Sequence, residues 1–292
     1  MKKYSYHLVW LAGIYLLSAF TANDTAYEQE IQQWHQKRVE SLKAESGWLN
    51  LAGLFWLEEG KNTFGGDGKN NVNFPADKSN PFLGEIILEK GKVTLKANAD
   101  AEVFNGDAPV TELDIFPGEK PVTLRHKSLR WFIIKRGDKY AVRLRDLESE
   151  YLKGFSGIER YPVQENWRVK ARFEPTTGKK VSITDITGRT ADQDSPGTLV
   201  FNVGGKEYRL DAVGSTENLF IIFADQTNKT ETYGAGRFLY TSVEKDGSAW
   251  LDFNKSINPP CAFSPYATCP LPPKQNKLAL AVSAGEKRYG EH

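Results

Sequence analysis

The stretch that decides the fold is VTLRHKSLRWFIIKRGDKYAVRLRD, residues 122–146. It holds two runs of apolar, aromatic and β-branched residues, separated by the Arg-Gly-Asp turn signal at 136–138. Such runs around a short glycine turn are typical of a β-hairpin. Similar runs recur outward from it: WLNLAGLFWL (48–57), EIILEKGKVTLKA (85–97), WRVKARFEP (167–175), GTLVFNVGG (197–205) and NLFIIFAD (218–225). The sequence therefore predicts a mainly β protein built from antiparallel sheets, as a β-sandwich or a barrel-like closed sheet.

Basic residues alternate with apolar residues inside this stretch. Lys127 and Arg130 form one pair, and Arg143 and Arg145 form another. This alternation predicts a solvated strand face rather than a surface for nucleic acid. The chain has 292 residues, with 38 Lys and Arg against 37 Asp and Glu, so its formal net charge is +1. A chain this close to neutral has no overall basic field that would attract nucleic acid.

The N-terminal residues predict a helix and, before it, a signal peptide. Residues 27–46 form the expected amphipathic helix, because Tyr27, Ile31 and Leu42 lie at helical spacings. Residues 1–26 combine two early lysines, an uncharged apolar run and several small residues, which is the pattern of a signal peptide. We therefore expect an exported protein, periplasmic in a bacterium, with no membrane span in the mature chain.

The sequence lacks the motifs of metal and cofactor chemistry. The chain has four His and two Cys, too few thiols for a four-thiolate zinc site. It contains no GxSxG, HExxH, Walker loop or GxGxxG pattern. The sequence thus predicts no metal and no cofactor.

Four segments together resemble one family. They are GWLNLAGLFWLEEGKNTFG (47–65), FSGIERYPV (155–163), TYGAGRFLY (232–240) and DFNKSINPPCAFSPYATCPLPPKQNKL (252–278). In these segments the chain is similar to the bacterial domain-of-unknown-function 1684 family (DUF1684), and the resemblance extends over essentially the whole mature chain. It implies no established activity.

The first half also resembles a second family. Within 47–148, the glycines and asparagines that follow Leu54-Phe55-Trp56-Leu57 are similar to a forkhead-associated (FHA) β-sandwich. That fold binds phosphothreonine through an arginine and a Ser-x-x-His motif. Here Gly66 stands in place of the arginine, and residues 79–82 end in Phe rather than His. The resemblance therefore implies the shape of that domain without its charge-assisted phosphate contacts.

The chain divides into two β parts. A polar segment with two Gly and a Pro lies near 148–166, so we expect an FHA-like part at 47–148 and a second antiparallel part at 149–292. Residues 259–273 hold six of the 14 prolines. Proline cannot donate to a central strand, so this segment is predicted to be an extended strap. The alternative to two separate parts is that both halves form one unit.

A dense set of polar residues in the second part predicts a ligand site. Arg237 can hold a carboxylate or phosphate with its planar guanidinium, and Tyr233 lies close by in sequence. Asp252 and Asn254 are two residues apart and would share one strand face. Asn258 completes the set. The alternative is structural: an Arg237–Asp252 pair that satisfies a partly buried sheet, with Asn258 capping a turn.

Cys261 and Cys269 are separated by eight positions. In an oxidising compartment the first expectation is a disulfide, which would stabilise the fold by about 2.6 kcal/mol in the chain-entropy model. Two reduced, buried thiols are the main alternative, and a redox-active pair is a third.

These observations lead to two functional hypotheses. The first is a non-catalytic exported protein that binds a small polar or anionic ligand, or an envelope protein, between the second sheet and the strap. The second is a hydrolase-like enzyme in the same cleft, with Asp252 as the base and Tyr233 or Arg237 as electrophilic support.

Overall fold

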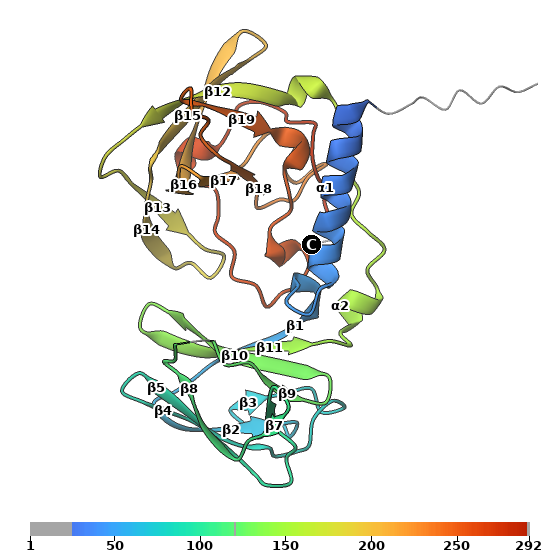
Figure 1. Cartoon of the computed structure of the whole chain (residues 1–292), viewed down its shortest axis with the longest axis vertical. Coiled ribbons are helices and arrows are strands. Elements are labelled where there is room, and N and C mark those ends of the chain that lie inside the picture. Colours follow the sequence, from blue (N-terminus) through green and yellow to red (C-terminus); the bar gives the residue numbers. More distant parts are fainter. Residues whose placement is uncertain (1–24, 120, 291–292) are drawn as a thin grey trace, which may run out of the picture.

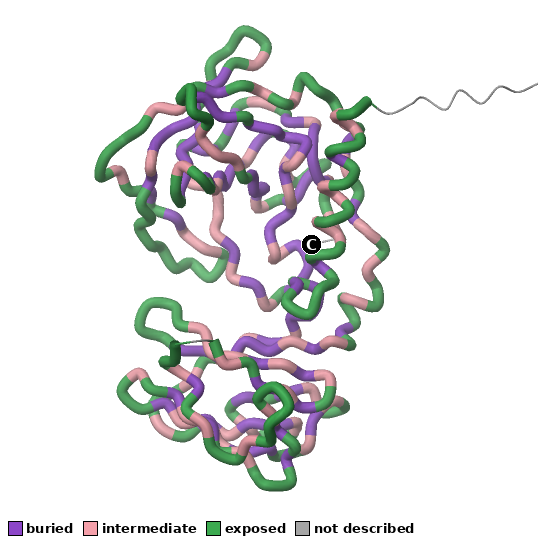
Figure 2. Tube along the Cα trace, in the orientation of Figure 1, coloured by how far each residue is buried: buried purple, intermediate pink, exposed green. Residues whose placement is uncertain are grey.

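The structure is a computed structural model that describes residues 25–119 and 121–290. Two β lobes lie one above the other along the long axis, and a long helix runs beside the upper lobe (Figure 1). Each lobe has its own buried interior (Figure 2). The prediction of a mainly β protein with antiparallel sheets and one N-terminal helix is confirmed.

The lower lobe consists of two facing sheets. The first has the strand order β1-β11-β10-β9-β6-β7. Its strands are β1 (Leu51–Trp56), β6 (Phe104–Asn105), β7 (Ala108–Pro109), β9 (Leu124–His126), β10 (Leu129–Arg136) and β11 (Lys139–Asp146). The second has the order β3-β2-β4-β5-β8. Its strands are β2 (Gly60–Gly65), β3 (Val72–Asn73), β4 (Gly84–Glu89), β5 (Lys92–Ala97) and β8 (Glu112–Phe116). Between the sheets Trp131 packs on Phe64 and Phe74, which places the core where the alternating apolar residues meet.

The upper lobe is one curved sheet with a small hairpin. Its order is β18-β17-β16-β15-β12-β19. The strands are β12 (Arg168–Pro175), β15 (Gly197–Val203), β16 (Lys206–Ser215), β17 (Asn218–Phe223), β18 (Arg237–Thr241) and β19 (Ser248–Asp252). A bridge between Val243 and Ala249 brings the two ends of the sheet together, so the lobe is a partly closed barrel. The hairpin is formed by β13 (Lys180–Thr184) and β14 (Thr190–Asp194).

Helix α1 (Ala26–Lys43) packs along the upper lobe. Thr25 and Glu28 form a capping box at its start, so the helix begins one residue before the predicted 27–46. It ends three residues earlier because Ala44 adopts an extended conformation. Of the predicted signal peptide, residues 1–24 lie outside the described residues. Among residues 25–119 and 121–290, no helix has both the length and the apolar character needed to cross a membrane.

Short helical segments connect the two lobes and follow the last strand. They are η1 (Trp48–Asn50), α2 (Glu150–Lys153), η2 (Glu165–Trp167), η3 (Phe253–Lys255), η4 (Pro260–Ala262) and η5 (Lys274–Asn276). The chain enters the upper lobe through α2 and η2. The predicted Pro-rich strap contains η4 and passes between the lobes, where Leu51 of β1 packs with Ala267 and Cys269. The two lobes therefore share one continuous apolar contact.

Candidate functional site

The basic residues of the β10–β11 hairpin face the upper lobe. Arg143 of β11 is paired with Phe132 of β10, and Arg145 is paired with Arg130, so these side chains share one face of the sheet. Only 5% of Arg143 is exposed. The predicted solvated strand face is therefore wrong for Arg143, because a second lobe covers that face.

A cleft of about 500 Å³ lies between the lobes, a size typical of small-molecule sites. Arg136, Arg143 and Arg145 line it from the lower lobe, and Arg38 lines it from α1. The rest of its wall is mostly apolar and aromatic, and is contributed by Trp48, Leu51, Phe132, Ile134, Phe220, Phe238, Tyr240, Ile257, Pro260, Ala267 and Pro270. The cleft thus combines cations with flat apolar surfaces.

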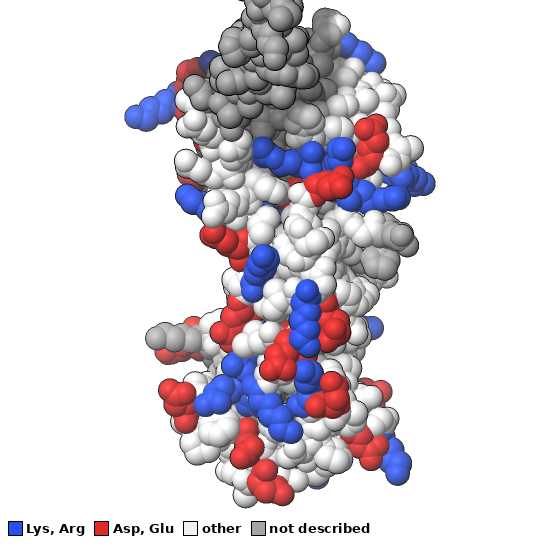
Figure 3. All heavy atoms as spheres, turned by 90° about the vertical axis from the view of Figure 1, so that its right-hand side faces the viewer, with Lys and Arg blue, Asp and Glu red and all other residues white. Residues whose placement is uncertain are grey.

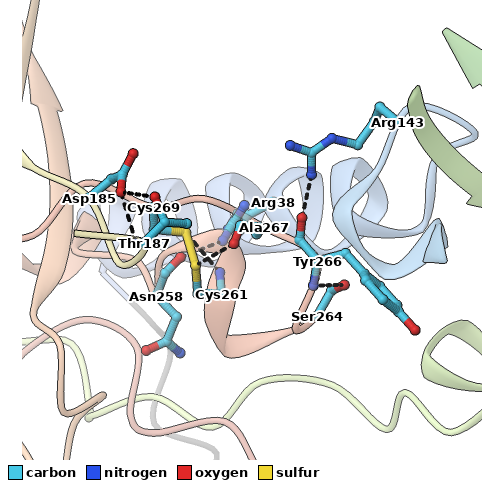
Figure 4. The surroundings of a disulfide bond; sticks show 10 residues. All are labelled: Arg38, Arg143, Asp185, Thr187, Asn258, Cys261, Ser264, Tyr266, Ala267 and Cys269. Carbon is cyan, nitrogen blue, oxygen red and sulfur yellow. Dashed lines mark hydrogen bonds between the residues drawn. A yellow bond between two sulfur atoms is a disulfide. The ribbon is translucent and has the colours of Figure 1, made fainter. Parts of the chain in front are cut away.

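Arg143 is a buried cation without an anionic partner. Its Nη1 donates to the carbonyl of Tyr266 at 2.6 Å (Figure 4). No carboxylate lies within ion-pair distance of it in the part of the chain that the structure describes. Burial, together with the charges of Arg136 and Arg145, lowers the pKa of Arg143 to about 10. The guanidinium is therefore desolvated beside like charges.

The neighbouring arginines are partly compensated. Arg38 forms an ion pair with Glu286 at 3.2 Å. Arg145 lies over the ring of Phe132, 5.5 Å from its centroid. Burial lowers the pKa of Arg145, and the negative charge of Glu45 partly offsets this effect. The Glu45 carboxylate, however, pairs directly with Arg130 at 2.9 Å. The charge inside the cleft remains positive.

The cleft lining is suited to holding an anion. Among the described residues, its wall contains no Asp, Glu or His, and Cys269 is joined to Cys261. Tyr240 contributes a titratable hydroxyl, whose pKa is raised by burial. On the side that carries α1, Lys and Arg are interspersed with Asp and Glu on both lobes (Figure 3). That outer face has no continuous surface of one sign, unlike the cleft.

The disulfide fixes the upper wall of the cleft. Cys261 and Cys269 are joined, with their Cα atoms 6.1 Å apart. The loop that they close includes Tyr266, whose carbonyl accepts the hydrogen bond from Arg143. In Figure 4, Arg143 reaches this loop from a neighbouring strand. The cross-link therefore holds in place the backbone group on which Arg143 depends.

Comparison with known proteins gives one family. Residues 153–287 match the model of the family described as "Protein of unknown function (DUF1684)". Over these residues the chain is similar to this family. The match covers the upper lobe and the disulfide loop rather than the whole mature chain that the sequence resemblance suggested. The lower wall of the cleft, formed by β10 and β11, precedes it.

Two solved structures resemble parts of this chain. One is an uncharacterized protein of Haloarcula marismortui, with 31% identity over 48% of this chain and 80% of that chain, at a TM-score of 0.40. The other comes from a study of phosphothreonine-dependent FHA domain interactions, with 19% identity over 32% of this chain and 92% of that chain, at a TM-score of 0.22. The FHA similarity suggested by the sequence is thus found, but it is too weak to carry a functional argument. No curated protein matches the chain.

Two of the predicted site residues lie together beside helix α1. Asp252 accepts a hydrogen bond from the Tyr27 hydroxyl at 2.8 Å, and the side-chain amide of Asn254 donates to the Tyr27 hydroxyl oxygen at 2.9 Å. Asn254 also exchanges hydrogen bonds with the backbone of Gln164. Burial and Asp252 raise the pKa of Tyr27. This network attaches the helix to the end of β19.

Arg237 lies elsewhere, fully buried inside the upper lobe. It forms an ion pair with Asp225 at 2.8 Å, and both side chains are 0% exposed. It also donates to the carbonyls of Val282 at 2.9 Å and Ala284 at 2.5 Å. The predicted structural alternative, an Arg237–Asp252 pair, is therefore wrong: the partner of Arg237 is Asp225.

Asn258 and Tyr233 occupy two further places. Asn258 donates its backbone N–H to Glu286 at 2.6 Å and its side-chain amide to the Lys287 carbonyl at 2.7 Å, and it also lines the inter-lobe cleft. Tyr233 is buried in an apolar cluster with Phe263, and burial raises its pKa. The five predicted residues thus do not converge on one cleft, and ligand binding by them as a set stays a prediction.

Sequence reasoning missed Arg38 and Arg136, and it misplaced Arg143 on a solvated face. The signal was present in the hairpin. In this hairpin the even-numbered residues of 130–136 pair with the odd-numbered residues of 139–145, so their side chains share one face of the sheet. Several of these residues are arginines. What the alternation could not show is the lobe that covers this face.

Proposed function

We propose that this protein binds a small organic anion in the cleft between its lobes. The observation that carries the proposal is Arg143, a guanidinium that is 5% exposed and has no carboxylate partner among the described residues. An unpaired charge in a protein interior is costly unless something compensates it. A ligand carboxylate or phosphate would supply that compensation through charge-assisted hydrogen bonds.

The remaining wall indicates the character of the ligand. Phe132, Phe220 and Tyr240 line the cleft, and a pocket with a mostly apolar wall buries most of its ligand's surface. An inorganic ion would leave these surfaces in contact with water. We therefore propose an amphipathic ligand, with an anionic group at Arg143 and an apolar or aromatic body against the rings.

Binding without catalysis is favoured over hydrolysis. The cleft wall offers no carboxylate or imidazole among its described residues, and these are the groups that most often act as a general base. The residues considered for hydrolysis are separated, because Arg237 pairs with Asp225 and Asp252 pairs with Tyr27. The proposed role is a binding protein.

We also propose that the protein acts outside the cytoplasm, in a bacterial periplasm. Two features support this: the signal-peptide pattern of residues 1–26 and the disulfide between Cys261 and Cys269. Expression of the full chain in a bacterium, followed by fractionation and mass spectrometry of the N-terminus, tests it. A chain that stays in the cytoplasm with residues 1–26 attached would contradict the proposal.

Calorimetric titration with 2-naphthoate tests the ligand proposal, with uncharged 2-naphthamide as the matched control ligand. We expect saturable binding of the carboxylate only, and a higher melting temperature in its presence, because a ligand that binds the folded state stabilises it. Arg143→Gln should abolish binding. Arg172→Gln, which changes an exposed arginine of β12 paired with Glu174, should leave binding unchanged.

The outcomes separate the proposal from its alternatives. Equal binding of naphthoate and naphthamide would show apolar adsorption without anion recognition. Naphthoate binding that survives Arg143→Gln, with the variant folded, would remove Arg143 from the site. Either result would overturn the proposal.

A further inference from the structure

A second hollow adjoins the inter-lobe cleft at the tip of the β10–β11 hairpin. Its volume is about 500 Å³. Arg136 and Thr268 line both cavities, so the two lie side by side, and we call them together the groove. Three other residues matter for its chemistry: Trp56, Lys139 and Arg189.

The charge of the second hollow is also positive. In the described chain, no ion pair involves Arg136, Lys139 or Arg189. The one acidic residue in its wall, Asp185, already accepts hydrogen bonds from the backbone N–H of Thr187 at 2.8 Å and of Arg189 at 3.2 Å. These bonds hold one oxygen of that carboxylate, Oδ1, within its own turn, and the three cations of the wall outnumber its single negative charge.

Arg189 comes to this place from the upper lobe. It directly precedes β14, and its guanidinium reaches the lower-lobe turn at Gly137. A Cβ at Gly137 would lie 3.3 Å from its Nη2. The two hairpins therefore meet at this end of the groove, and each contributes a cation.

An apolar strip separates the two groups of cations. Arg143 and Lys139 are four positions apart on β11, which corresponds to roughly 13 Å along a strand. Between them lies Ala141, which is paired with Ile134 on one side and with Trp56 on the other. Trp56 is 43% exposed, and it offers a flat apolar surface next to the strip.

We propose that the ligand of this groove is an elongated dianion, with two anionic groups joined by an apolar or aromatic spacer. One group binds at Arg143 and Arg145. The other binds at Lys139, at its cross-strand neighbour Arg136 and at Arg189. The spacer lies over Ile134 and Trp56, which line the two cavities on either side of the buried Ala141. This inference rests on the proposed function and specifies the class of its ligand.

The test compares biphenyl-4-carboxylate with biphenyl-4,4′-dicarboxylate by calorimetric titration of the full protein. We expect the dicarboxylate to bind about tenfold more tightly or better, because a second charge-assisted contact is added. Lys139→Gln/Arg189→Gln should lower the affinity for the dicarboxylate to that for the monocarboxylate. The double variant should leave the monocarboxylate unchanged, and Arg143→Gln should weaken both ligands.

A control double variant changes the net charge of the protein by the same amount as Lys139→Gln/Arg189→Gln. Lys170→Gln/Arg209→Gln removes two exposed positive charges from the upper lobe and should change neither affinity. Equal affinity for the two ligands would overturn the dianion inference, and so would an equal loss for both ligands in Lys139→Gln/Arg189→Gln. Monocarboxylate binding that depends on Arg143 would still support the proposed function in either case. Failure of both ligands to bind would overturn both proposals.

Discussion

Each lobe buries an arginine, and the two arginines differ in what surrounds the guanidinium. Arg237 in the upper lobe is paired with the equally buried Asp225 and donates to backbone carbonyls. Arg143 in the lower lobe has a single carbonyl acceptor, that of Tyr266, and like charges nearby. The first cation is compensated by the protein itself, and the second is open to an anion from outside.

This difference is the one that we expect between a structural charge and the binding charge that we propose. Breaking a buried ion pair leaves its partner uncompensated, which is strongly destabilising. Removing a buried cation that has no anionic partner removes a desolvation cost and one hydrogen bond, and the two changes oppose each other. Stability measurements can therefore separate the two arginines before any ligand is known.

The largest effect is expected at Arg237. Arg237→Met should lower the free energy of unfolding by about 3–5 kcal/mol, because Asp225 is left buried and unpaired. Urea denaturation measures this. The double variant Asp225→Asn/Arg237→Met removes both charges and should recover part of the loss. A loss below about 1 kcal/mol in Arg237→Met would contradict the comparison.

The second-largest effect is expected from removal of the disulfide. Cys261→Ala/Cys269→Ala should lower the free energy of unfolding by about 2.6 kcal/mol, because the unfolded chain is no longer constrained by the closed loop. The same variant should weaken naphthoate binding, since the loop holds the Tyr266 carbonyl that positions Arg143. Unfolding in urea with and without dithiothreitol provides the control, and reductant should not affect the double variant. Unchanged stability would contradict the structural role of the cross-link.

A smaller effect on the free energy of unfolding is expected when the pH is lowered, because His126 is buried. This side chain is 0% exposed, and burial lowers its pKa below the usual 6.5. The unfolded state then binds the proton more readily. The stability from neutral His126 is therefore complete above pH 6.5 and decreases as the pH falls below that value, by at most about 1.4 kcal/mol per pH unit.

Unfolding measured between pH 5 and 8 in wild type and in His126→Phe tests this. The variant should lose part of the slope below pH 6.5. His35→Gln is the comparison variant, because burial also lowers the pKa of the partly buried His35, and it should remove a smaller part. An unchanged slope in His126→Phe would show that His126 does not contribute.

The smallest effect is expected at Arg143. Arg143→Met should change the free energy of unfolding by less than about 1 kcal/mol, because the lost hydrogen bond to Tyr266 offsets the relieved desolvation. The same urea experiment as for Arg237→Met measures it. A loss as large as that at Arg237 would mean that Arg143 is structural, and it would sharply weaken the binding proposal.

Much of the fold could be predicted from local sequence. The stretch at 122–146 contains β9, β10 and β11, with the turn between β10 and β11 at the predicted Arg-Gly-Asp signal. The helix prediction was off by one residue at its start and three at its end. These features depend on neighbouring residues, which propensity and periodicity describe well.

The candidate site could be predicted only in part. Arg237, Asp252 and Asn254 are polar residues near strand ends, and the sequence grouped them because they are close along the chain. In the structure Arg237 pairs with Asp225 and donates to carbonyls of residues 282–284, while Asp252 and Asn254 bind Tyr27 of the distant helix. Partners so far apart in sequence leave no local pattern.

The sequence by itself determined which residues share a face of the β10–β11 hairpin. Side chains alternate along a strand with a period of two, so Phe132 and Arg143 had to lie on one face, opposite the face that packs on the core. Only the tertiary structure decided what covers that face. The upper lobe and the disulfide loop bury Arg143 without giving it a carboxylate, because burial and charge pairing depend on surfaces that meet only when the two lobes pack together.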